Sequence, residues 1–203
     1  MSVVPVAAGA FRITQLTAGA EVTPDNARFF ADPVPVVVHI VSVTVYCVAG
    51  ALQFAPGLRA RGRGWHRVAG RVLVPFGLAA ALSGLWMTLF YPRPEVVGDL
   101  TTAFRLVFGS AMAGAIVLGF AAVRRREFAR HRAWMIRGYA IGLGAGTQAF
   151  TFAFWYVAVG PVDTLSNAMM MLAGWLINVV VAEWIIRRPD ARRRRRAAAG
   201  GSR

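Results

Sequence analysis

The sequence RRREFARHRAWMIRGY, residues 124–139, passes from a dense basic run into a long apolar segment, with no proline or glycine between the two. Six arginines and His131 stand at the start of the apolar part, followed by Trp134 and Tyr139, aromatic residues of the kind found at membrane surfaces. This pattern is typical of the boundary between water and a bilayer. It predicts that a membrane helix begins here.

The composition extends this interpretation to the whole chain. Of its 203 residues, 57% are hydrophobic, against roughly 45–50% in soluble domains. The net charge of +14 would suggest nucleic-acid binding if it were spread over the chain. Instead, all 23 basic residues are arginine and 19 of them fall in three blocks, 59–71, 124–137 and 187–203. The sequence therefore predicts a multi-pass membrane protein without a nucleic-acid partner.

The apolar segments predict an all-α bundle of five transmembrane helices. They lie at about 34–54, 66–91, 100–123, 131–159 and 165–186, each long enough to cross a hydrocarbon core of ~30 Å. Because arginine-rich loops stay on the cytoplasmic side, the three blocks place the N-terminus outside and the C-terminus inside. Residues 1–32 are then an external cap before the transmembrane domain at 33–188, and 189–203 a disordered basic cytoplasmic tail that attracts anionic lipid.

Several polar residues lie within the apolar segments: His39, Arg105, Gln148, Asn178 and Glu183. Lipid offers no hydrogen bonds, so these side chains should face protein. We expect His39 to bond a neighbouring helix, Glu183 to pair with an arginine, and Arg105 to reach the interface or pair within the bundle. A line formed by four of these residues, His39, Gln148, Asn178 and Glu183, could also serve protons, a quinone or a small transported molecule. Gly138, Gly142 and Gly146 indicate close helix packing.

Two histidines are candidate ligands of a redox cofactor. His66 and His131 each follow a basic loop at the inner mouth of a predicted helix, and together could give two imidazoles to one haem iron. His39 lies near the outer end of its helix, too far away to share that site. The surrounding arginines could hold haem propionates or lipid headgroups: Arg67, Arg71, Arg132 and Arg137. The alternative is that both His-Arg pairs are interfacial anchors.

Motifs of soluble-type enzymes are missing from the sequence. It has no P-loop, no dinucleotide-binding glycine fingerprint, no HExxH metalloprotease motif and no nucleophile elbow. Its single cysteine, Cys47, lies in an apolar run and reads as a small hydrophobic side chain. These absences exclude a soluble-type enzyme and leave open a membrane oxidoreductase component.

Five short motifs carry a resemblance to a known family: HRVAGR (66–71), GLWMT (84–88), HRAWMIR (131–137), GAGTQ (144–148) and AEWIIRR (182–188). In this combination the chain resembles the bacterial membrane proteins of domain of unknown function 2306, a likeness that implies a multi-spanning fold and no established reaction. It is more distantly similar to cytochrome b-561 and ferric-reductase type haem proteins. Those typically use four histidines for two haems, and this chain has three.

The leading hypothesis from the sequence is a protein of the bacterial cytoplasmic membrane that transfers electrons through one b-type haem held by His66 and His131, with a redox partner or quinone. The first alternative is a non-catalytic membrane protein whose inner arginine and histidine rim binds anionic lipid or a partner complex. The second is a small transporter that uses the polar groups within the bundle.

Overall fold

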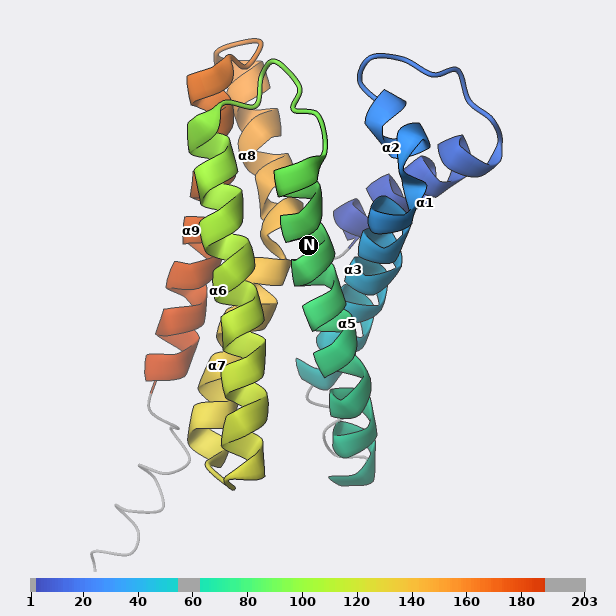
Figure 1. Cartoon of the computed structure of the whole chain (residues 1–203). Helices are drawn as coiled ribbons and strands as arrows, with labels where there is room; N and C mark the ends of the chain where they lie inside the picture. Colours follow the sequence, from blue (N-terminus) through green and yellow to red (C-terminus); the bar gives the residue numbers. More distant parts are fainter. Residues whose placement is uncertain (1–2, 55–62, 189–203) are drawn as a thin grey trace, which may run out of the picture.

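Every regular element in the described part of the chain is an α-helix (Figure 1). The computed structural model describes residues 3–54 and 63–188, without the side chains at 54, 63 and 65–67. Within these ranges the helices are α1 (Val3–Thr17), α2 (Ala27–Ala31), α3 (Pro33–Phe54), α5 (Arg63–Phe90), α6 (Asp99–Arg124), α7 (Phe128–Gly142), α8 (Gly144–Ala158) and α9 (Thr164–Arg187). The predicted tail at 189–203 lies outside the described residues.

Four of these helices are long and apolar enough to cross a membrane. Their spans are Pro33–Gln53, Val68–Phe90, Asp99–Arg124 and Thr164–Arg187, which correspond to the first, second, third and fifth predicted segments. Large apolar side chains cover their outer faces, with Val107 62% and Val180 65% exposed. Such faces need an apolar solvent, and a bilayer supplies it. The chain is a membrane-embedded, multi-pass helical protein.

The prediction of one continuous helix at 131–159 is wrong. Two helices of 15 residues each, α7 and α8, meet at Leu143, and α8 continues beyond α7 along the length of the bundle (Figure 1). Gly142 and Gly144 flank the break, and glycine weakens a helix by about 1 kcal/mol per residue relative to alanine. A Cβ atom on Gly144 would overlap the Trp175 indole, so the packing of α9 requires glycine there. Tertiary contacts therefore override the apolar pattern at this point.

The centre of the bundle is built around Tyr46 of α3, which is 2% exposed. Its ring lies between α5 and α7: a Cβ atom would be 2.6 Å from the ring at Gly77 and 2.9 Å from it at Gly142. Tyr46 belongs to a core cluster that includes Leu73 and Ile116. Gly142, one of the glycines that predicted close packing, thus makes room together with Gly77 for one large aromatic side chain.

Neighbouring helices pack in a simple order. Helix α3 packs against α5, α5 against α6, and α6 against α7, while α9 packs against α6, α7 and α8. Helix α1 lies against α3 and α8. One end of the bundle holds α2 and the segment 91–98, and we call it the α2 end; the other holds the turn 125–127 and the last turn of α9, and we call it the arginine end (Figure 1).

Helix α9 begins at the α2 end with a capping box. The Asp163 carboxylate accepts a hydrogen bond from the Ser166 amide at 2.7 Å, and the Ser166 hydroxyl accepts one from the Asp163 amide at 2.8 Å. These two bonds satisfy amide groups that have no partner within the helix. Hydrogen bonds from the Ser166 hydroxyl and amide hold the pKa of Asp163 below its usual range.

Candidate functional site

A cavity of about 560 Å³ opens at the α2 end of the bundle, between α1, α2 and the longer helices. Its size is within the ~300–1,000 Å³ of ordinary small-molecule sites. Much of its wall is apolar or aromatic, with Tyr46 from α3, Leu85 from α5, Met112 from α6 and Trp175 from α9. The cavity is therefore shaped for a ligand with a substantial apolar part.

Three arginines from distant parts of the sequence also line this cavity: Arg12, Arg28 and Arg105. The guanidinium groups of Arg12 and Arg28 lie 4.5 and 4.6 Å from the centre of the Phe29 ring. Partial burial lowers the pKa of Arg28 and the positive charge of Arg12 lowers it further, while the negative charge of Asp25 acts in the opposite direction. Arginine stays charged even so, and the cluster makes this wall of the cavity strongly positive.

Arg105 is the most deeply placed of these cations. Its Nη2 atom lies 3.8 Å from Met171 Sδ on α9, and Arg28 lines the same cavity. Across residues 3–54 and 63–188, no carboxylate lies within 4.0 Å of the Arg105 guanidinium. The sequence allowed Arg105 either to reach the membrane interface or to pair within the bundle, and no such pair is present among the described residues. The cation faces a cavity with its charge uncompensated.

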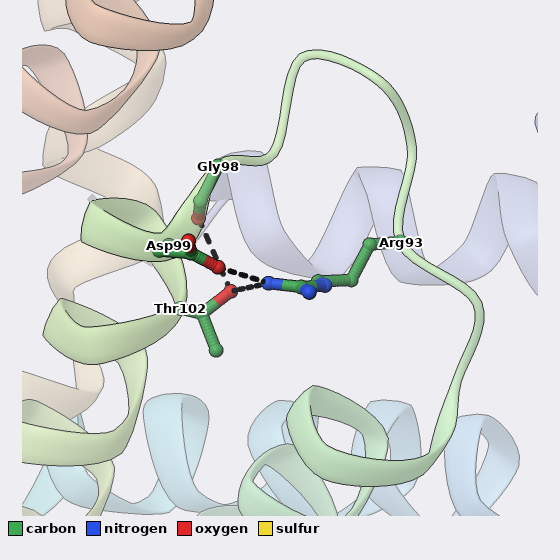
Figure 2. Close-up of polar contacts among 4 residues, drawn as sticks. All are labelled: Arg93, Gly98, Asp99 and Thr102. Atoms are coloured by element: carbon green, nitrogen blue, oxygen red, sulfur yellow. Dashed lines mark hydrogen bonds and ion pairs between the residues drawn. The ribbon is translucent and has the colours of Figure 1, made fainter.

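The fourth arginine on the cavity wall, Arg93, differs from the other three because it is paired with a carboxylate. Figure 2 shows its Nη1 atom donating to Asp99 Oδ1 at 2.7 Å and to Thr102 Oγ1 at 3.4 Å. Both partners belong to the first turn of α6, and the Thr102 hydroxyl donates in turn to the Gly98 carbonyl. This pair sits at the mouth of the cavity and joins the 91–98 segment to α6. Its charge is already balanced.

His39 also lines the cavity, but its polar contacts are internal. Its Nδ1 atom lies 2.9 Å from the Ala80 carbonyl oxygen and 3.1 Å from Ser83 Oγ, both on α5. The expected hydrogen bond to a neighbouring helix is present. With Nδ1 donating to the carbonyl, the ring is held in one orientation against Gly84.

Two further buried polar residues tie helices together. The Gln148 amide on α8 donates to the Met171 carbonyl of α9 at 3.0 Å, and Gln148 lines the cavity. Asn178 on α9 donates to the Ala140 carbonyl of α7 and accepts from the Thr147 hydroxyl. These bonds sit beside the α7–α8 break and hold both half-helices against α9. The polar line suggested by the sequence is thus a set of bonds between helices.

At the arginine end, Glu183 of α9 pairs with an arginine, as expected, and a second arginine lies close to it. It accepts from Arg137 Nε at 2.5 Å and Nη2 at 3.1 Å, and Arg187 Nε lies 3.4 Å away. Arg137 also lies over the Trp134 ring at 4.9 Å. Arg71 and Arg132 are exposed at this end.

The two candidate haem ligands are not brought together by any described contact. His131 Nδ1 lies 2.8 Å from the Gly119 carbonyl of α6, which holds the imidazole against that helix. His66 belongs to the first turns of α5, and its side chain and that of Arg67 lie outside the described part of the structure. In residues 3–54 and 63–188, no group of three or more His, Cys, Asp or Glu side chains is placed to hold a metal ion.

The sequence did not predict the cavity, although it singled out four residues that line it: His39, Arg105, Gly142 and Gln148. Arg12 and Arg28 fall within residues 1–32, which the sequence assigned only to an external cap. No periodicity links α1 and α2 to the transmembrane helices. The one available signal was Arg105 itself, a cation inside an apolar segment, since such residues usually mark a functional position.

Comparisons with known proteins give one match. A family model described as "Predicted membrane protein (DUF2306)" matches residues 36–186. No curated protein and no solved structure matches the chain. The distant similarity to cytochrome b-561 and ferric reductases has no counterpart in these comparisons.

Proposed function

The chain belongs to the DUF2306 family of predicted membrane proteins, and from that premise we propose that it binds an anionic amphiphile in the cavity at the α2 end. The ligand has one carboxylate or phosphate head and an apolar body. A binding site inside a membrane protein fits a carrier or receptor of such molecules. The proposal therefore specifies a ligand class for the transporter alternative.

The observation that carries the proposal is Arg105. A cation removed from water costs several kcal/mol unless a counter-charge compensates it. Arg105 has no carboxylate within 4.0 Å in the described residues, and it shares the cavity wall with a second cation, Arg28. An anion in the cavity would supply the missing charge, and guanidinium groups bind carboxylate and phosphate oxygens in pairs.

The rest of the cavity favours a ligand with one charged end. Three arginines that form no salt bridge within 4.0 Å in the described residues, Arg12, Arg28 and Arg105, line the cavity together with the aromatic and sulfur-containing side chains of Tyr46, Met112 and Trp175. The charge of Asp25 offsets part of that of Arg28. A doubly charged ion without an apolar part would leave those apolar surfaces uncovered. A neutral lipid would leave the arginines uncompensated.

The proposal is tested by ligand binding to protein in nanodiscs of neutral phosphatidylcholine. Dibromostearate, a fatty acid that quenches tryptophan fluorescence, should quench Trp175 when its chain enters the cavity. Oleate and dodecyl phosphate should displace it, whereas oleyl alcohol should not. Arg105→Gln should weaken binding about 10- to 100-fold, as expected for losing one hydrogen-bonded charge partner worth roughly 1.5–3 kcal/mol.

Two matched controls make the result specific. Arg93→Gln removes an arginine that lines the same cavity but is paired with Asp99, and should change affinity less than Arg105→Gln. Arg130→Gln removes an exposed arginine at the other end, and should have no effect. Equal affinity for oleate and oleyl alcohol, or equal losses in Arg105→Gln and Arg130→Gln, would refute the proposal.

We further infer that α7 and α8 together form the fourth of five membrane segments, with the α2 end outside the bacterial cytoplasmic membrane. Helices α7 and α8 follow one another along the bundle (Figure 1), and the arginine blocks at 59–71, 124–137 and 187–203 favour the cytoplasm. Single cysteines at Glu21 and Arg125, in a Cys47→Ala background, should react with an impermeant reagent from the outside and the inside respectively. The reverse labelling would overturn the orientation.

A second candidate function, haem-based electron transfer, is favoured by one contact. With His131 Nδ1 donating to the Gly119 carbonyl, Nε2 has no hydrogen-bond partner among the described residues and suits an axial ligand. His66 would be the second ligand, while Arg71 and Arg132 would hold propionates. Arg137 is less suited to bind a propionate because it is already paired with Glu183. A bound haem would supply one-electron chemistry between a quinone or redox partner and its acceptor.

The absorption spectrum of the protein purified from haem-producing cells tests this candidate. Sharp reduced α and β bands after dithionite, lost in both His66→Ala and His131→Ala and kept in His39→Gln, are the expected result. If the purified protein has no Soret band although circular dichroism shows that it is folded, the haem candidate is refuted. The cavity proposal is not affected by that result.

A further inference from the structure

A second hollow lies on the outside of the bundle, between α7 and α9 at the arginine end. It is a groove of about 410 Å³. Its lining includes Arg132, Ile136 and Leu143 on the α7 side and Asn178, Val181 and Ile185 on the α9 side. It shares no lining residue with the cavity at the α2 end. We propose that this groove binds one anionic phospholipid, with an acyl chain between the helices and the phosphate on Arg132.

The length of the groove fits one acyl chain of one leaflet. Along α7 and the residue that follows it, the groove extends from Arg132 to Leu143, eleven residue steps, which at ~1.5 Å per step is about 16 Å. Half of a ~30 Å hydrocarbon core is about 15 Å. The groove ends at the break between α7 and α8, where the chain of a lipid from that leaflet would also end.

The chemistry of the walls points to the same occupant. Asn178 is already bonded to Ala140 and Thr147, and the Tyr139 hydroxyl donates to the Cys47 carbonyl of α3. The remaining lining is apolar apart from Arg132. Val181 is 47% exposed, so this surface is open to the surroundings of the bundle and not closed by another described helix.

The charge at the mouth selects an anionic headgroup. Near this end Glu127 pairs with Arg130, and Glu183 pairs with Arg137 and Arg187, so both carboxylates are taken. Arg132 is exposed and has no carboxylate within 4.0 Å in the described part of the chain. A phosphate can accept two parallel hydrogen bonds from its guanidinium group.

Native mass spectrometry of the purified full chain, titrated with phosphatidylglycerol or phosphatidylcholine, tests the site. The protein should hold one phosphatidylglycerol more tightly than any phosphatidylcholine. Arg132→Gln should weaken that binding about five- to tenfold, whereas Arg130→Gln, with the same loss of charge on the same helix, should change it less than about twofold.

A second pair of variants tests the groove itself. Val181→Trp places a large side chain in the groove and should reduce retention of phosphatidylglycerol, while Val180→Trp, at a 65% exposed neighbour outside the lining, should not. Equal weakening by the two arginine variants would mean diffuse attraction to a basic surface. That outcome would overturn the assignment. So would equal retention of phosphatidylcholine and phosphatidylglycerol, or equal effects of the two tryptophan variants.

Discussion

Replacing Gly174 by alanine tests the packing that holds the α8 half-helix in place. Gly174 of α9 lies directly against α8, where a Cβ atom would be 2.6 Å from Gln148 Cγ, 3.0 Å from its amide nitrogen and 3.1 Å from its Cα. The side chain of Gln148 can rotate, but the backbone of a helix cannot move aside locally. Gly174→Ala must therefore push α8 and α9 apart.

The size of the effect follows from two opposing terms. Overpacking costs about 1–3 kcal/mol, and replacing a helical glycine by alanine stabilises the helix by up to about 1 kcal/mol. Gly114 of α6 is the matched control, because no atom of a packing neighbour in the described residues lies within 4 Å of its Cβ position. Gly114→Ala carries the second term alone, so the difference between the two variants isolates the overpacking, about 1–3 kcal/mol.

Thermal unfolding in detergent, followed by tryptophan fluorescence at one scan rate, measures this difference. At about 2–4 °C per kcal/mol for a chain of this length, Gly174→Ala should melt about 2–12 °C below Gly114→Ala. It should also weaken dibromostearate binding, since Gln148 lines the cavity. Equal melting temperatures for the two variants would refute the close contact between α8 and α9.

Three further predictions follow from single contacts. Glu183→Gln should lower the free energy of unfolding by about 1–2 kcal/mol, because Arg137, the partner of Glu183, is only 30% exposed. Glu127→Gln, which breaks an exposed pair, should lower it by less than about 0.5 kcal/mol in the same unfolding assay. The pKa of Asp163 is lowered by folding, so the stability that it adds over Asp163→Ala should be full above about pH 5 and shrink as the pH falls below about 4; a difference that grows on acidification would contradict the capping box. The Tyr46 hydroxyl is buried without a hydrogen-bond partner in the described residues, so Tyr46→Phe should be neutral or stabilise by about 1 kcal/mol, and a clear loss of stability would reveal a missing partner.

Much of the fold was predictable because membrane insertion depends on local sums along the chain. The apolar segments at 34–54, 100–123 and 165–186 match α3, α6 and α9 to within a few residues. Hydrophobicity summed over about 20 residues determines whether a segment can enter lipid. The summed hydrophobicity did not predict the break at Leu143, because that break depends on the close packing of Gly144 against Trp175 and not on the polarity of the segment.

The candidate site was predictable only in part. The pairing of Glu183 with an arginine and the hydrogen bond of His39 follow from the rule that polar groups in lipid need partners within the protein. Which arginine lacks a partner does not follow from that rule. Arg71 and Arg105 are both cations near apolar segments, but only Arg105 faces a cavity.

The sequence by itself determined that this is a multi-pass helical membrane protein with its arginines gathered in three blocks, because hydropathy and charge are read from neighbouring residues. The tertiary structure alone decided that Arg12, Arg28 and Arg105 share one cavity, and that Arg132 opens onto a separate groove. Compensation of a charge depends on distances of a few ångströms between segments far apart in the chain. Those distances exist only once the helices have packed.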